Sequence, residues 1–420
     1  MIEFETRYDS LSNGVRRLEI PIPHDETAVC AVFVKAGSRN EITRREAGIS
    51  HAIEHKVYRG TTMRSGNDYA LAVDRLGSDS NAYTDREHTM FHIDVEAKYA
   101  QKSLELLSEV LVKPDFPRRA MKKENGVLVG EMADNNDNPY VLLSETFENM
   151  LYGKNSMSKP ILGTKDSVRA HTKRDLTRYM DKWYRGENVL VVLAGKIKRM
   201  GNLVEKYFGS LPPGPVTEPL DKVGYGKERQ RILTIDSGQA HFILGVPGIS
   251  MKDPNFYTFQ IMESVLGSME SSRLYSKVRS SKGLVYDIST SNEVGTEVGY
   301  LSIEGSVQPQ LLAKTLKTVK TEIFNLSKTI TREEVIRAKT FLRGNLLRRM
   351  RNTLKIAEML GIPALFLNIV EQPKQILEKI DRVTLSDVRN LAKTLLVPEE
   401  MRLAILGPFD ENLKRVREFN

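Results

Sequence analysis

The 420-residue sequence contains a single cysteine and no long apolar run. Cys30 cannot form a disulfide within the chain, which fits a reducing compartment and leaves stability to the hydrophobic core. No apolar stretch approaches the roughly 18 residues that a membrane helix needs, so we expect no membrane span. Residues 1–7 lack the basic and apolar regions of a secretory signal. We therefore expect a cytoplasmic protein; a mitochondrial matrix location would follow if a targeting segment had been removed.

The charge balance is mildly basic, with 62 lysines and arginines against 54 acidic residues and a net charge of +8. The basic residues are dispersed, and the densest cluster, 343–351, falls within one predicted helix. No zinc knuckle, helix-turn-helix or RNP-like aromatic motif is found. We therefore expect no specific nucleic-acid partner. A hydrophobic fraction of 40% describes a globular chain, and the length predicts two or more domains.

Three landmarks recur at nearly one offset, which predicts a duplicated domain of about 210 residues. Two strand-ending glycines and one helix start recur 211 or 212 residues later: Gly37 and Gly248, Thr172 and Thr384, and Gly195 and Gly407. A Pro/Gly-rich stretch separates the copies, so we predict domains at 1–210 and 228–420 joined by a linker at 211–227. Each copy is expected to be α+β, a mixed, mainly antiparallel sheet with helices packed on it.

The stretch from Gly48 to His55 contains the strongest chemical pattern in the chain. His51, Glu54 and His55 would project from one side of a helix. Two imidazoles four residues apart can bind one metal ion, and a carboxylate beside them can reach a water on that metal. Taken alone, the pattern would also fit a chance cluster on a solvated helix.

Zinc hydrolysis needs a third protein ligand and an open position. Glu131 is the natural candidate, because it lies on a separate predicted helix with Glu124 two turns before it on the same face. By itself, Glu131 would equally fit an exposed helix carboxylate. Glu54 is expected to take a proton from the attacking water and to pass it to the leaving amine. Two histidines and one glutamate favour zinc, although they do not separate it from manganese or cobalt.

Two motifs together resemble the pitrilysin/insulinase metallopeptidase family, the inverzincins: Gly48-x-x-His51-x-x-Glu54-His55 and Glu124-x6-Glu131. One chain with both halves is similar to the bacterial processing-protease and mitochondrial processing peptidase branch. The resemblance implies that His51, His55 and Glu131 bind one zinc ion per chain. It implies that Glu54 is the general base and that Glu124 supports the site. Lys56 departs from the family pattern and adds a charge beside the motif.

Two further segments extend the resemblance towards substrate binding. Asn81, Ala82 and Thr84 resemble the segment that offers a strand edge to the substrate backbone in this family. Arg279 and Tyr286 resemble the pair contributed by the non-catalytic half. Physically, Arg279 could hold a backbone carbonyl and Tyr286 could donate to a tetrahedral oxyanion. Tyr286 alone would also fit a core strand residue.

The second half is expected to lack a metal-binding pair, because the positions matching His51 and His55 fall near Glu263 and Gly267. The resemblance implies a zinc-dependent endopeptidase that hydrolyses peptides or unfolded segments inside a chamber formed by two domain pairs. Since one chain holds both motifs, we expect a homodimer. The alternative is an inactive or structural peptide-binding homologue of processing peptidase subunits, which would be expected to have lost the metal set.

Overall fold

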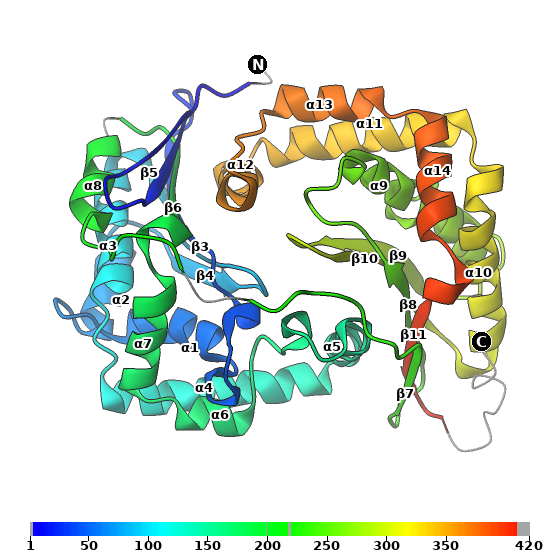
Figure 1. Ribbon diagram of the computed structural model, residues 1–420, viewed down its shortest axis with the longest axis horizontal. Coiled ribbons are helices and arrows are strands. Elements are labelled where there is room, and N and C mark those ends of the chain that lie inside the picture. The colour runs from blue at the N-terminus through cyan, green and yellow to red at the C-terminus, as the bar shows by residue number, and fades with distance from the viewer. Residues whose placement is uncertain (1–2, 199, 217–219, 410–420) are drawn as a thin grey trace. The chain divides into compact units, whose positions relative to one another are not determined.

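The computed structural model describes residues 3–198, 200–216 and 220–409 (Figure 1). The chain forms two compact units, each made of three separate segments. The first unit comprises the described residues of Met1–Ala133, Lys159–Asp221 and Leu347–Lys374. The second comprises those of Asp134–Ser158, Lys222–Leu346 and Gln375–Asn420.

A six-stranded sheet in the order β1-β2-β6-β3-β5-β4 forms the centre of the first unit. Its strands are β1 (Arg7–Ser10), β2 (Arg16–Pro21), β3 (Thr27–Val34), β4 (Ser80–Thr84), β5 (Thr89–Glu96) and β6 (Val189–Gly195). Only the β2–β6 pairing is parallel among these strands. A turn containing Asn13 and Gly14 joins β1 to β2, with Gly14 at φ 89°. β4 lies at the edge of the sheet, and among the described strands it pairs with β5 alone.

Helices cover both faces of this sheet. They are α1 (Ile49–Lys56), α2 (Gly66–Asp74), α3 (Ala100–Val112), most of α4 (Arg118–Asp137), α6 (Lys165–Ala170), α7 (Lys173–Trp183), α8 (Gly201–Phe208) and α12 (Thr353–Leu367). Val32 of β3 belongs to the same core cluster as Leu104 of α3. The next residue, Phe33, faces the other way and meets α12, where a Cβ on Gly361 would lie 2.9 Å from its ring. This close approach explains a glycine inside α12.

A five-stranded sheet in the order β7-β11-β8-β10-β9 forms the centre of the second unit. Its strands are β7 (Gln230–Thr234), β8 (Ala240–Pro247), β9 (Asp287–Val294), β10 (Gly299–Val307) and β11 (Arg402–Gly407). Here the β7–β11 pairing is parallel and the others are antiparallel. The order and directions therefore repeat those of β2, β6, β3, β5 and β4 in the first unit.

The second unit also has helices on both faces of its sheet. They are α5 (Pro139–Tyr152), α9 (Phe256–Glu263), α10 (Leu312–Thr329), most of α11 (Arg332–Arg349), most of α13 (Pro373–Arg382) and α14 (Leu385–Leu395). Helical segments at Ser264–Ser268 and Tyr275–Ser280 follow α9. On one face, α5 packs on β8 and β11, and Phe147 shares a core cluster with Ile243 and Leu406.

The predicted fold class is confirmed: the chain is α+β, with two mixed, mainly antiparallel sheets of one topology. The repeated helix starts are confirmed as well, since Thr172 and Thr384 both form capping boxes with the aspartate three residues later. The domain boundaries read from the sequence stay a prediction. The compact units differ from them in two segments, because 134–158 belongs to the second unit and 347–374 to the first.

Candidate metal centre

The motif helix α1 begins at Gly48, which adopts a left-handed conformation with φ 75°. A Cβ at this position would collide with the carbonyl oxygen of Leu162. Gly48 has no side chain to cap the helix, and Glu41 provides the cap instead. One carboxylate oxygen of Glu41 accepts from the Gly48 N–H at 2.8 Å and the other from the Ser50 N–H at 3.1 Å. Glu41 thereby satisfies two N–H groups at the positive end of the helix that carries the histidines.

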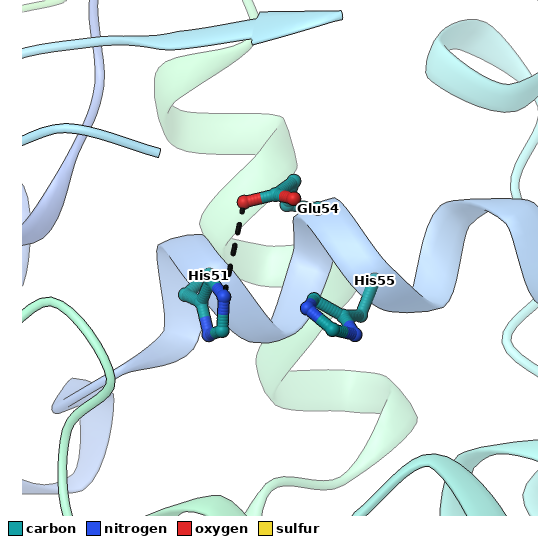
Figure 2. A group of neighbouring side chains, drawn as sticks. All are labelled: His51, Glu54 and His55. Carbon is teal, nitrogen blue, oxygen red and sulfur yellow. Dashed lines mark ion pairs between the residues drawn. The ribbon is translucent and has the colours of Figure 1, made fainter. Parts of the chain in front are cut away.

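His51 and His55 lie one turn apart on α1, with ring centroids 4.6 Å apart (Figure 2). The carboxylate of Glu131, on α4, approaches both rings. Its Oε1 lies 3.7 Å from His51 Nε2 and its Oε2 lies 3.5 Å from His55 Nε2. In a tetrahedral zinc site with bonds of about 2.05 Å, neighbouring ligand atoms are about 3.3 Å apart. Each of the two distances to Glu131 is within a few tenths of an ångström of that spacing, through a different carboxylate oxygen for each histidine.

Glu54 projects from the same side of α1, and its Oε2 lies 4.0 Å from His51 Nε2 (Figure 2). Across the described parts of the chain, His51, Glu54 and His55 form the one group of three or more histidine, cysteine, aspartate or glutamate side chains whose ligand atoms lie within 4.8 Å of one another. Glu54 is already held by Thr84, whose hydroxyl donates to Oε2 at 2.7 Å. Both carboxylates therefore lie beside the two imidazoles, Glu54 on the same helix and Glu131 on α4.

The protonation of the two histidines differs with their surroundings. Burial, with a smaller contribution from His55, lowers the pKa of His51 to about 3, so this imidazole is neutral and able to donate to a metal. Burial also lowers the pKa of His55, but the hydrogen bond to Glu124 and the charges of Glu54 and Glu131 outweigh it and raise the pKa overall. Burial raises the pKa of Glu54, which suits a general base that must accept a proton.

The carboxylate of Glu124 contacts both the imidazole of His55 and the guanidinium of Arg59. Its Oε1 is 3.0 Å from His55 Nδ1, and its Oε2 is 2.7 Å from Arg59 Nε. Burial raises the pKa of Glu124, but the hydrogen bonds with His55 and Arg59 outweigh it, and the pKa is lowered. An ionised Glu124 favours the His55 tautomer with its proton on Nδ1, which leaves Nε2 to face Glu131.

The predicted substrate segment lies on the edge strand β4. Asn81 is exposed, and its side-chain oxygen accepts from the N–H of Ala82 at 2.8 Å. Thr84, the last residue of the strand, turns its hydroxyl to Glu54. The sequence analysis missed this link, since no local pattern joins residue 84 to residue 54.

Arg279 and Tyr286 belong to the second unit. Arg279 donates to the hydroxyl of Tyr275 at 2.8 Å and stacks on its ring at 4.8 Å. Tyr286 immediately precedes β9 and is 54% exposed, and its hydroxyl accepts from Gln308 Nε2 at 3.3 Å. Tyr286 is therefore not a core strand residue, and its phenol is accessible.

The sequence analysis noted Lys56 as a charge beside the motif but did not predict its burial. Lys56 is fully buried, and its Nζ has no hydrogen-bond partner within the described residues. Burial lowers its pKa to about 8. The cap supplied by Glu41 was missed as well. A helix that starts at a glycine without a capping side chain was the available signal that a partner must come from elsewhere.

Two family models match successive parts of the chain. "Insulinase (Peptidase family M16)" matches residues 20–165, which contain the metal motif, and "Peptidase M16 inactive domain" matches residues 171–342.

Relatives and solved structures cover nearly the whole chain. A Rickettsia felis protein named "Uncharacterized zinc protease" is 30% identical over 95% of this chain and 97% of its own. A Bacillus subtilis protein named "Uncharacterized zinc protease YmxG" is 29% identical over 94% of this chain and 97% of its own length. The structure of a protease from Helicobacter pylori has a TM-score of 0.89 at 20% identity, covering 97% of this chain and all of that one. A peptidase M16 inactive domain structure from Pseudomonas fluorescens has a TM-score of 0.90 at 20% identity, covering 97% and 98%.

The two solved structures show a shared fold. The sequence relatives are similar over nearly the whole chain. With 30% identity across nearly the full length of both chains, the protein belongs to the insulinase family, peptidase family M16.

Proposed function

We propose that this protein is a zinc-dependent endopeptidase that hydrolyses peptides or unfolded segments. The observation that carries the proposal is the convergence of His51 Nε2 and His55 Nε2 on the two oxygens of Glu131, with Glu54 held beside them. A structural homologue without activity would have no need of this arrangement. Relatives named zinc proteases, similar over the full chain, support the same conclusion.

His51, His55 and Glu131 would hold the ion. When bound, zinc supplies a Lewis acid that polarises a peptide carbonyl and makes water more acidic. Glu54 takes the proton of the attacking water and later gives it to the leaving amine. Its partly buried side chain and raised pKa favour both transfers. Glu124 and Arg59 hold His55 in the orientation that points Nε2 towards Glu131.

For the substrate, we propose that an extended peptide adds to the free edge of β4 by backbone hydrogen bonds. Arg279 would bind a substrate carbonyl, and Tyr286 would donate to the oxyanion. The exposed phenol of Tyr286 supports this role. Tyr286→Phe should lower turnover without altering the unfolding midpoint. An unchanged rate would contradict the assignment.

We further propose a homodimer in which two domain pairs enclose a chamber. Light scattering at assay concentration should give twice the mass of one chain, and a monomeric mass with full activity would contradict the pairing. No helix among the described residues has the length and apolar character of a membrane span. The cytoplasmic location stays a prediction.

Cleavage of a peptide library by purified protein of measured metal content tests the proposed activity. Glu54→Gln should abolish cleavage while zinc stays bound, and a chelator should abolish it reversibly. Glu333→Gln, a change of the same kind at an exposed position of α11, should have no effect. Cleavage by Glu54→Gln at the wild-type rate would refute the mechanism. Zinc binding without any cleavage by the wild type would favour the inactive homologue.

A further inference from the structure

The edge strand β4 and the motif helix α1 are joined by one side-chain hydrogen bond. Thr84 Oγ1 donates to Glu54 Oε2 at 2.7 Å. Among the described residues, Thr84 is the one hydrogen-bond donor to this carboxylate, and the Glu54 side chain is only 12% exposed. Water therefore has little opportunity to replace the threonine. A long side chain with several rotamers is held in one position by a short side chain on the sheet.

The second unit contains a hydrogen bond of the same kind, although at other positions of the repeat, because Glu263 matches His51 and not Glu54. Glu263, the last residue of α9, accepts a hydrogen bond from the hydroxyl of Thr290. Thr290 lies in β9, the strand that occupies the place of β4 at the edge of the second sheet. Ser268 also donates to Glu263. A helix glutamate bound to an edge-strand threonine thus occurs in both units, at positions of the repeat that do not correspond.

The two copies differ in what surrounds the glutamate. In the first unit Glu54 lies beside two imidazoles that also approach Glu131, and in the second unit Glu263 has hydroxyl partners from Ser268 and Thr290. In the first unit, the glutamate held by the edge strand is the residue proposed to move a proton. The link also lies on the strand whose free edge is the expected docking site for a peptide backbone.

We propose that Thr84 is a positioning residue, which holds Glu54 in the orientation required for proton transfer and connects that orientation to substrate pairing along β4. This inference rests on the proposed function, since it requires Glu54 to be the general base. Thr84 acts through its hydroxyl on Glu54 and not through contact with the substrate. A peptide paired along β4 would fix the strand, and with it Thr84 and the base.

This role predicts an effect on turnover and not on binding. Thr84→Val keeps the shape and removes the donor, so kcat should fall about ten- to a hundred-fold, the usual effect of losing a hydrogen bond to a charged group. KM and zinc content should stay within about threefold of wild type. Thr84→Ser restores the hydroxyl and should recover most of kcat. Thr290→Val removes a hydrogen bond of the same kind, to Glu263 in the second unit, and should leave kcat unchanged.

The experiment compares these variants and Glu54→Gln in one peptide-cleavage assay, with thermal unfolding of each protein and Thr84→Ala as a second variant if valine prevents folding. Thr84→Val at the wild-type rate beside an inactive Glu54→Gln would overturn the inference and leave the proposed function standing. Equal losses of kcat and stability in Thr84→Val and Thr290→Val would also overturn it, because they would show a structural link only. Wild-type cleavage no faster than that of Glu54→Gln would overturn the proposed function, and this inference with it.

Discussion

Replacing Glu124 by glutamine should weaken zinc binding without removing any proposed ligand. The Glu124 carboxylate is buried and accepts at Oε1 from Arg59 Nη2 at 3.0 Å, with His55 Nδ1 also at 3.0 Å, while its Oε2 lies 2.7 Å from Arg59 Nε. A carboxamide offers one oxygen and one NH2 group. If its oxygen faces His55, the NH2 meets the Nε–H of Arg59. If the amide is reversed, His55 must accept at Nδ1 and carry its proton on Nε2, where the metal would bind.

The expected loss follows from this conflict. Removing the outer partner of a metal-bound histidine commonly lowers affinity ten- to a hundred-fold. That range corresponds to about 1.4–2.7 kcal/mol of binding free energy. The lost ion pair adds little to this, because Arg59 is 48% exposed and its attraction is screened by solvent. Metal-free protein should lose about 1–2 kcal/mol of unfolding free energy, from a buried polar group without a suitable partner.

A competition titration against a chromophoric chelator at pH 7.5 measures the zinc affinity, and circular dichroism confirms the fold. Arg59→Gln is the matched control, because it removes the ion pair and keeps the contact between His55 and Glu124. Its zinc affinity should stay within about threefold of wild type. A folded Glu124→Gln protein that binds zinc as tightly as wild type would refute the reasoning. Equal weakening in both variants would show that Glu124 acts through Arg59 instead of His55.

Three other predictions concern the scaffold. Gly48→Ala should lower the unfolding free energy by about 2–4 kcal/mol in urea titrations, because it strains a left-handed residue and collides with a backbone carbonyl; a loss below 0.5 kcal/mol, roughly the effect of an ordinary surface change, would contradict this. Burial raises the pKa of Asp175, but its hydrogen bonds, including one from Arg45, lower it to about 2. Its contribution of about 2 kcal/mol is therefore full above pH 4 and lost as the pH falls towards 2, so Asp175→Asn should differ from wild type at pH 6 and converge with it near pH 2. Burial raises the pKa of Cys30 to about 12, so iodoacetamide should alkylate it only after unfolding; rapid labelling of native protein would be inconsistent with its burial.

Local patterns were sufficient wherever the deciding interaction lies within a few residues. Helix spacing placed His51, Glu54 and His55 on one side of α1, and the capping pattern located the start of α7 and of α14. Even local signals compete, however. Ser65 caps α2, and Asp68, which is also a capping residue type, is the residue whose N–H bonds to it. Two capping residues three positions apart fit the same helix in either register.

These local patterns do not predict which sheet an amphipathic helix packs against. The spacing of apolar residues in α5 and α12 shows that each helix buries one face, but it does not say which sheet covers that face. α5 packs on the sheet of the second unit and α12 on that of the first. A division of the chain at one linker therefore separates the repeats in sequence without describing the compact units.

The metal centre combines both kinds of information. Its two histidines are four residues apart, so the sequence alone places them one helix turn from each other. Bringing Glu131 within 3.7 Å of His51, and Glu41 onto the start of the same helix, requires packing between segments far apart in the chain. The hydrogen bond between Thr84 and Glu54 depends in the same way on an edge strand lying beside the helix. Residue types and spacing alone thus indicated the metal ligands and the base. The groups that hold and orient these side chains were decided by tertiary structure, because contacts between segments far apart in the chain leave no periodic pattern in the sequence.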